Sequence, residues 1–536
     1  MRRALRVSAV STLILCALGL APRLAHATGV IEFPDNGSEQ EGRGGAWVAR
    51  ASDPLATFYN PAGLAGQQTR LTLQANVSTQ HTCFTRVKAA NDQTADGVMP
   101  GASYPQACQD PNFFPNPQLA FAYRLTDRIG LGIAILGPSA VGGVTWPDFQ
   151  GTKASPQRNL LISSSVLLLT PTIGVGWEPI DGLRIGASFI FGTAPSIDFK
   201  NASPALLEGD LSPQANDIRT ELKAKDLFLP GFILGTIWSP IDRLDVAAWY
   251  KFMAPINATG DVTTQVNYYV NPANPQKPVV YGDTSQANCN NPMLTNNPCG
   301  SGNNAKITVP LPMEAKLGVR YHQPRSDKPV DPHLRDPIAQ DVFDVEADFT
   351  WANDSAFDAI QIRFPGTAGG QGLIPANPYL AGAVLPPNAD VPHEFRDVFG
   401  VRLGGDYNVL PDRLALRGGG FFETQAAQAQ YQNIDFDAAS RFGVALGGTY
   451  RLRLGDHPLD LMAGYGHVFF ATLSNTDPGA KGLPALTGDS ACPGGGNPKN
   501  GTCPSGVQTY RTPWAVNLGT ITSSIDVINV GASFGF

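Results

Sequence analysis

Histidines and cysteines, the side chains most often used in catalysis and metal binding, form no catalytic or metal-binding pattern here. Of seven histidines, His26 lies in an N-terminal leader; no two of the rest lie in HExxH spacing, and no CxxC pair occurs. A chance Ser–His pairing is expected in a chain of 536 residues, and no local signature groups Ser or an acid with His. We therefore predict no enzyme, metal site or cofactor. The remaining histidines are His81, His322, His333, His393, His457 and His467.

The cysteines instead predict disulfides. Cys16 lies in the leader, and the other six form three pairs of near neighbours along the chain. An even number is typical of an oxidising compartment. Among the many pairings that six cysteines allow, pairing the neighbours is the only one that closes every bridge within one connection of the strand pattern given below. The predicted bridges are Cys83–Cys108, Cys289–Cys299 and Cys492–Cys503.

Residues 1–27 predict a cleaved secretory signal. Basic residues precede an apolar run from Val7 to Ala21, and Ala25-His26-Ala27 has the small-x-small cleavage pattern. Pro22 and Arg23 end the run too early for a membrane anchor. Beyond the leader no apolar stretch of roughly 18 residues occurs, so we expect no transmembrane helix.

The composition narrows the class of exported protein. Charged residues are only 15% of the chain, whereas glycine (57) and proline (45) are abundant. The net charge of −7 offers no basic surface for nucleic acid. Low charge and high glycine suit a transmembrane β-barrel, whose outer face meets lipid and whose small inward residues pack against a filling.

The C-terminal sequence IDVINVGASFGF supports the barrel. Its apolar and small polar residues alternate strictly, and it ends on Phe536. A strand of a soluble sandwich could alternate in the same way, but it rarely stops at a terminal aromatic residue. Bacterial outer-membrane proteins resemble this pattern, because the barrel assembly machinery reads their C-terminal aromatic strand. We therefore expect that machinery as a partner.

Fourteen candidate strands predict an all-β fold, a 14-stranded antiparallel transmembrane barrel. Short Asp-containing turns alternate with long Asn/Pro/Gly-rich connections, which places the short turns on the periplasmic side. The segment 323–339 is a longer, more charged turn on that side. The strands are 69–80, 117–126, 128–137, 163–178, 183–199, 226–239, 244–263, 307–322, 340–352, 397–410, 413–425, 440–453, 459–472 and 521–536.

A barrel of this size needs a filling, and only the segment before the first strand is spare. There, EGRGGAWVARASDPLATFYNPAGLAG (41–66) resembles the N-terminal hatch signature of the FadL-like family, outer-membrane transporters of long-chain fatty acids and aromatic hydrocarbons. DVFGVRLGGDYNVLPDRLALRGG (397–419) and the terminal strand also resemble that family. The resemblance implies a hatch at 28–68 that plugs a barrel at 69–536. The hatch residues that it implies for gating are Gly44, Gly45, Phe58, Asn60, Pro61 and Ala62.

The same resemblance implies passive, hatch-gated transport of hydrophobic or amphipathic small molecules by a monomer in the bacterial outer membrane, with its lipid as a second partner. Loops capture the ligand, an apolar pocket holds it, and a hatch shift opens a lateral exit at a kinked third strand. Gly137 and Pro138 are the candidate kink; the alternative is that they merely end the strand. A general diffusion porin and a surface adhesin remain the alternative functions, and the ligand is a fatty acid, an aromatic hydrocarbon or another lipid.

Alternation also turns many charges inward on the eighth to twelfth strands, whereas the second to seventh turn mostly small residues inward. An apolar ligand would therefore pass more easily along the half formed by the second to seventh strands, because it strips no water from fixed charges there. Arg402 and Arg417 are candidates for binding a ligand carboxylate; the alternative is a structural wall. The inward charges are Glu314, Lys316, Arg320, Asp344, Glu346, Asp348, Arg402, Asp406, Arg417, Glu423 and Arg441.

Overall fold

A computed structural model describes most of the chain beyond the leader. The described residues are 36–92, 96–137, 143–203, 217–265, 268–269, 273, 278–280, 305–326, 333–363, 374–375, 384–385, 388–476 and 515–536. The predicted signal, Pro138 and the cysteine pairs Cys289–Cys299 and Cys492–Cys503 lie outside them.

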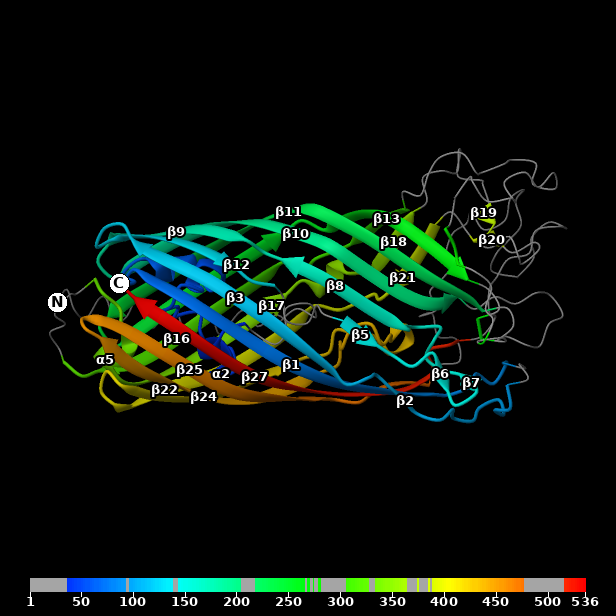
Figure 1. Ribbon diagram of the computed structural model, residues 1–536. Helices are drawn as coiled ribbons and strands as arrows, with labels where there is room; N and C mark the ends of the chain where they lie inside the picture. The colour runs from blue at the N-terminus through cyan, green and yellow to red at the C-terminus, as the bar shows by residue number, and fades with distance from the viewer. Residues whose placement is uncertain are drawn as a thin grey trace, which may run out of the picture.

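Antiparallel strands form a closed barrel with fourteen strand positions around its wall (Figure 1). The barrel closes because β1 (Arg70–Arg86) pairs with β27 (Gly519–Gly535) along its whole length. The other main wall strands, in order around the barrel, are β3 (Asn112–Arg124), β4 (Ile129–Ile135), β9 (Thr172–Ile180), β10 (Leu183–Ser203), β11 (Ile218–Ile241), β12 (Leu244–Met253), β16 (Glu314–Pro324), β17 (Asp341–Ala352), β22 (Val398–Leu410), β23 (Leu414–Glu423), β24 (Arg441–Leu454) and β25 (His457–Phe470).

Several wall positions consist of two strands in succession, where the sequence predicts one. Pro171 separates β8 (Ser163–Leu169) from β9, and Pro255 separates β12 from β13 (Ile256–Gln265). A proline has no backbone N–H for the ladder, and these two prolines coincide with the breaks, although β3 and β11 continue past prolines of their own. The other added segments are β5 (Gly143–Thr145), β15 (Ala305–Val309), β18 (Ala359–Arg363), β21 (Asn388–Pro392) and β26 (Leu473–Asn475).

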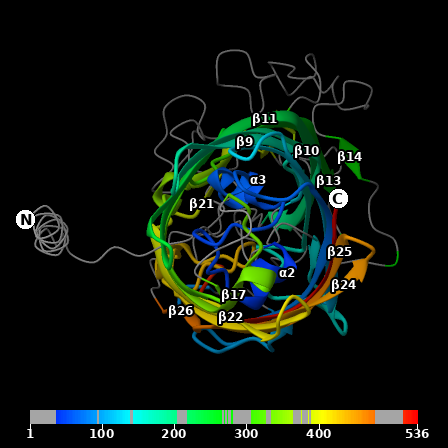
Figure 2. The same ribbon diagram turned by 90° about the vertical axis from the view of Figure 1, so that its left-hand side faces the viewer.

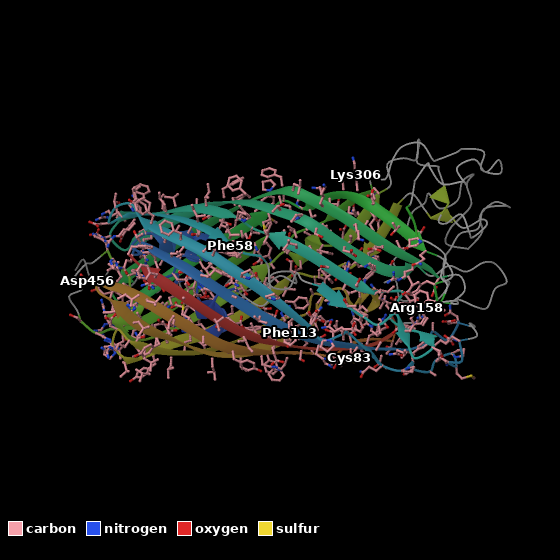
Figure 3. The ribbon with its side chains drawn as sticks, in the orientation of Figure 1. Phe58, Cys83, Phe113, Arg158, Lys306 and Asp456 are labelled. Atoms are coloured by element: carbon pink, nitrogen blue, oxygen red, sulfur yellow. A yellow bond between two sulfur atoms is a disulfide. The ribbon has the colours of Figure 1, made fainter. Side chains whose placement is uncertain are left out.

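The wall alternates between an apolar outer face and a small or polar inner face. In β4, Leu131, Ile133 and Ile135 are exposed, while Gly132 and Ala134 between them are buried. Side chains such as Phe113 project from the outside of the barrel (Figure 3). All eleven charged residues predicted to face inward are buried, in agreement with the alternation.

Short turns and the C-terminus lie at one end of the barrel, and the described parts of the long connections, such as β6 (Phe149–Gln150) and β7 (Lys153–Ala154), lie at the other (Figure 1). We call these the short-turn end and the long-loop end. The turn predicted at 323–339 carries α5 (Pro337–Gln340) at the short-turn end. Small elements of the long-loop end are β2 (Ala107–Cys108), β6 (Phe149–Gln150), β7 (Lys153–Ala154), β14 (Val279–Val280), β19 (Ile374–Pro375), β20 (Val384–Leu385), η2 (Asp354–Ala356) and η4 (Ala429–Tyr431).

Residues 36–69, which we call the plug segment, lie inside the ring of strands (Figure 2). The segment contains α2 (Ser38–Gly42), α3 (Ala56–Tyr59) and the 3-10 turn η1 (Pro61–Leu64). From residue 36 to 67 every residue except Glu39 and Ser52 is buried. In the part of the chain that the structure describes, no helix has the length and apolar character needed to cross a membrane.

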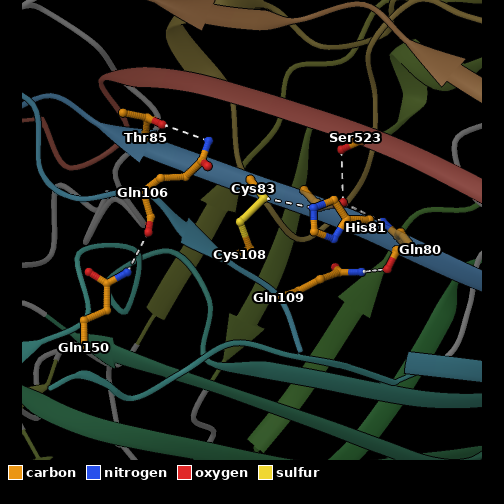
Figure 4. The surroundings of a disulfide bond; sticks show 10 residues. Gln80, His81, Cys83, Thr85, Gln106, Cys108, Gln109, Gln150 and Ser523 are labelled. Carbon is orange, nitrogen blue, oxygen red and sulfur yellow. Dashed lines mark hydrogen bonds between the residues drawn. A yellow bond between two sulfur atoms is a disulfide. The ribbon is translucent and has the colours of Figure 1, made fainter. Parts of the chain in front are cut away.

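Cys83 and Cys108 form a disulfide, which confirms the first predicted bridge (Figure 4). Cys83 belongs to β1 and Cys108 to β2, and the two residues face each other in the antiparallel ladder. The bridge therefore lies on an extension of the wall, because β1 runs to Arg86, six residues beyond the end predicted at residue 80. The His81 ring lies beside the bridge, but both sulfurs are bonded to each other rather than available as metal ligands.

Candidate ligand cavity and plug segment

Residues 60–64 of the plug segment, which begin with the Asn60-Pro61-Ala62 turn, pack against wall glycines on the inside of β4, β9, β10 and β11. At each of these glycines an added Cβ would collide with the plug segment, so the turn approaches the wall as closely as only glycine allows. The distances from such a Cβ are 2.0 Å at Gly130 to Leu64 O, 2.5 Å at Gly176 to Pro61 O, 2.2 Å at Gly186 to the Pro61 carbonyl carbon and 2.0 Å at Gly235 to Asn60 Oδ1.

Asn60 holds the turn together through both ends of its amide. Its Nδ2 donates to the Val48 carbonyl at 2.8 Å, and its Oδ1 accepts from the backbone N–H of Ala62 at 3.2 Å. Phe58 is buried, and its carbonyl accepts from Trp249 Nε1 at 3.1 Å. Apolar residues surround this turn because it contacts the barrel wall instead of water.

Gly44 and Gly45 let the other side of the plug segment approach the wall. Their φ angles are +62° and +77°, a region that side-chain-bearing residues rarely adopt. A Cβ on Gly44 would lie 2.5 Å from the backbone nitrogen of Gly420 in β23. The plug segment is therefore fitted to both halves of the barrel.

Two plug arginines bind the acidic part of the wall. Arg43 Nη1 lies 2.6 Å from both Asp344 Oδ1 and Asp406 Oδ1, and its Nη2 lies 3.3 Å from Glu346. Arg50 pairs with Asp344 and, at 3.1 Å, with Asp406. All five side chains are almost fully buried, so removing one partner would leave an uncompensated charge.

Wall carboxylates also accept backbone hydrogen bonds from the plug segment. Asp348 Oδ2 accepts from the N–H groups of Trp47 and Val48 at 2.9 and 3.2 Å. Glu346 Oε1 accepts from the N–H of Ala49 at 2.6 Å. The inward acidic residues of β17 thus bind the plug, a partner that strand alternation alone did not suggest.

Arg402 and Arg417 belong to this same network of wall and plug. Arg402 Nη2 lies 2.8 Å from Glu423, and its Nη1 donates to the Gly44 carbonyl at 3.4 Å. Arg417 Nη2 donates to Thr449 Oγ1 at 2.5 Å and lies 3.3 Å from Asp406. These contacts support the structural alternative for both arginines, and their binding of a ligand carboxylate stays a prediction.

The third wall position is interrupted after β4, and Asn36 of the plug segment binds there. The Gly137 carbonyl accepts from Asn36 Nδ2 and from Asn116 Nδ2, each at 2.8 Å. Beyond Ile135 the chain next forms a strand at β5, which pairs with β8. Residues 112–118 of β3 consequently have no ladder partner on that side among the described strands. The interruption and the plug are therefore in direct contact.

A cavity lies between the plug segment and the long-loop end. It encloses about 1500 Å³ of empty space, including the part open to solvent, and no residue of the plug segment lines it. Most of the lining is aliphatic or aromatic, contributed by β8, β10, β13, β15 and β18. Residues with apolar side chains on the lining include Val166, Ile197, Leu222, Ile256, Ile307, Ile360 and Phe470.

The polar part of the lining comes from wall strands, which contribute Ser78, Gln80, Ser164 and Asp198, and from the connection 424–440 between β23 and β24. Asp435 and Asp437 reach the cavity from this connection, and Arg441 follows at the start of β24. The connection has no strand periodicity, so no pattern in the sequence predicted that its two acids would line the cavity. Their place on the lining depends on how the connection folds back into the barrel.

A closed barrel with an apolar outer face, a filled lumen and an apolar cavity is the architecture of an outer-membrane transport barrel. The family model "Outer membrane protein transport protein (OMPP1/FadL/TodX)" matches residues 33–493, so the chain belongs to that family, whose members are transport channels and not enzymes. Family members are outer-membrane proteins. A comparison with curated protein sequences finds no match.

Solved structures of this family share the fold. A Pseudomonas aeruginosa FadL homologue aligns with a TM-score of 0.64 at 16% identity, over 94% of this chain and 99% of that one. The toluene transporter TodX of P. putida aligns with a TM-score of 0.53 at 14% identity, over 95% of this chain and 99% of that one. At such identity the likeness shows the fold alone.

Proposed function

We propose that this protein carries apolar or amphipathic small molecules across the outer membrane, passively and under control of the plug segment. The cavity carries the proposal, because an apolar lining next to a filled lumen suits a molecule that leaves water during transport. TodX, which shares the fold, is a toluene transporter, which is consistent with such a cargo. A ligand that favours one arrangement of the plug would shift the population toward it without an energy source.

The exit in this proposal is lateral, at the interrupted third wall position. Asn36 of the plug segment binds Gly137 there, so movement of the plug would alter the interruption directly. The short-turn end faces the periplasm, and the leader is removed on export. The monomer assembles through its C-terminal strand, which precedes Phe536.

Uptake of octylbenzene by a transport-deficient strain tests the proposal. The wild-type protein should raise the uptake rate, and Ile256→Trp, which fills the cavity, should lower it several-fold at equal outer-membrane abundance. Leu131→Trp, on the exposed face of β4, is the matched control and should keep the wild-type rate. A high small-ion conductance of the purified protein would favour a porin, and uptake that is independent of the protein would favour an adhesin.

A further inference from the structure

The connection 424–440 forms the roof of the cavity. It places two carboxylates, those of Asp435 and Asp437, on a mostly apolar lining. The connection 424–440 packs into a buried cluster through Ala426, Ala427, Ile434 and Ala438. This packing holds the connection inside the long-loop end, and it carries Asp435 and Asp437 to the lining. Both acids are therefore fixed parts of the cavity.

Asp437 is bound by neutral groups. Its Oδ1 accepts from Ser523 Oγ at 2.6 Å, and its Oδ2 accepts from Thr82 Oγ1 at 3.3 Å and from the Gln80 amide. Among the described residues, no Lys, Arg or His nitrogen forms an ion pair with it. Burial raises the pKa of the Asp437 carboxyl. This side chain presents hydrogen-bond acceptors to whatever occupies the cavity.

The other charged groups of the lining already have ionic partners. Asp198 lies 3.8 Å from Lys200 Nζ and 3.9 Å from Lys223 Nζ. Asp435 lies 2.9 Å from His393 Nε2. Arg441 Nε lies 2.6 Å from Glu423 Oε2, and its guanidinium lies over the Phe470 ring at 5.9 Å. A ligand carboxylate would have to compete with Glu423 for Arg441 while facing Asp437 in a medium of low polarity, where like charges repel strongly.

We propose that the cavity selects apolar molecules whose polar end donates a hydrogen bond to Asp437, such as an alcohol, a phenol or an ammonium group, and discriminates against carboxylates. The proposal rests on the proposed function and names its substrate class. A donor head gains a hydrogen bond to an acidic side chain, whereas a carboxylate head offers only acceptors. A chain without a head group fills the apolar part alone.

Four ligands with the same chain test the selectivity: dodecanol, dodecylammonium, dodecanoate and dodecane. Binding is measured by competition against labelled dodecanol with the full-length protein in lipid nanodiscs, and empty nanodiscs correct for partition into lipid. Dodecanol should bind about tenfold or more tightly than dodecanoate, in line with one hydrogen bond to a charged group. If dodecylammonium binds more tightly than dodecanol, an ionised Asp437 also attracts the ligand's positive charge. If the two bind equally, the hydrogen-bond donor alone accounts for the affinity.

Asp437→Asn should reduce the dodecanol-to-dodecanoate ratio to within about threefold. Asp437→Ser replaces it if the Asn variant does not reach the membrane. Asp526→Asn is the control, since this acid of β27 is half exposed and bonded to Tyr465 and His467, and it should keep the wild-type ratio.

Dodecanoate binding as tightly as dodecanol, or an unchanged ratio in Asp437→Asn, would overturn the selectivity. The proposed function fails separately, if none of the four ligands binds. If dodecane binds but dodecanoate binds more tightly than dodecanol, only the selectivity is overturned, and the proposed function stands.

Discussion

Asn60 of the plug segment lies against Gly235 of β11 so closely that a Cβ on the glycine would stand 2.0 Å from Asn60 Oδ1. The same amide donates to the Val48 carbonyl and accepts from the Ala62 N–H. One side chain therefore orders the plug turn and sets its distance from the wall. Any residue larger than glycine at position 235 must displace it.

Gly235→Ala should loosen the plug segment while the barrel still assembles. The added methyl overlaps Asn60, and overpacking of this kind costs about 1–3 kcal/mol. Small-ion leak through the protein in planar bilayers should rise. Gly418→Ala is the matched control, because its Cβ would come no closer than 3.2 Å, to the flexible Leu446 side chain; equal leak in both variants would contradict the fit.

Replacing both Asn60 and Pro61 with Ala should leave a folded barrel that still resists heat on gels, because wall pairing does not depend on the turn. Loss of the Asn cap at the start of η1 alone should cost the turn about 1 kcal/mol. Uptake of octylbenzene should fall or ion leak should appear. A double variant with normal uptake and no leak would show that this turn has no part in gating.

Arg43→Met should destabilise docking of the plug segment by about 3–5 kcal/mol, because buried carboxylates lose a shared cation. Hydrogen exchange in residues 41–66, followed by mass spectrometry, should accelerate. Adding Asp406→Asn removes one negative charge, which balances the lost cation, while Asp344 stays paired with Arg50 and Arg320; this should restore part of the protection. Unchanged exchange in the single variant would mean that Arg50 alone holds this side.

A non-reducing peptide map should show three disulfides, of which Cys83–Cys108 is present in the structure. Replacing both of its cysteines with Ser should destabilise the long-loop extension by about 3 kcal/mol, since the bridge closes a sequence separation of 25 residues. Free thiols, or a bridge between different connections, would contradict the predicted pairing of the other four cysteines.

Docking of the plug segment should weaken as pH rises. Burial, and secondarily the nearby Glu39, raises the pKa of Asp53 from 3.8 to about 7. The docked segment thus retains a proton that the released segment loses, so this stabilisation declines between about pH 4 and pH 7 and is absent above it. Ion leak should be greater at pH 8 than at pH 5, and Asp53→Asn should flatten the profile. A wild-type leak that does not change with pH would exclude Asp53 as its source.

The positions of the strands, and which of their side chains face lipid or the lumen, were predictable because alternation is a local property of each strand. Ile133 and its neighbours in β4 face outward as the pattern indicates, and β27 has the alternation read from its sequence. Strand ends were less predictable. The extensions of β1 and β10 toward the long-loop end carry polar residues on both faces, so period-2 hydrophobicity gives no signal there, and ladder pairing alone maintains the strand.

The sequence by itself determined the class of wall, the number of its strands, a glycine-rich plug motif and one disulfide between near neighbours in the chain. Only the tertiary structure decided which groups the inward charges bind. Arg43 meets Asp344 across 301 residues of sequence, and Asp437 meets Ser523 on a strand that closes the barrel. Such contacts follow from barrel closure and from how a connection folds inward. Neither produces a periodic pattern in the sequence from which the contact could be predicted.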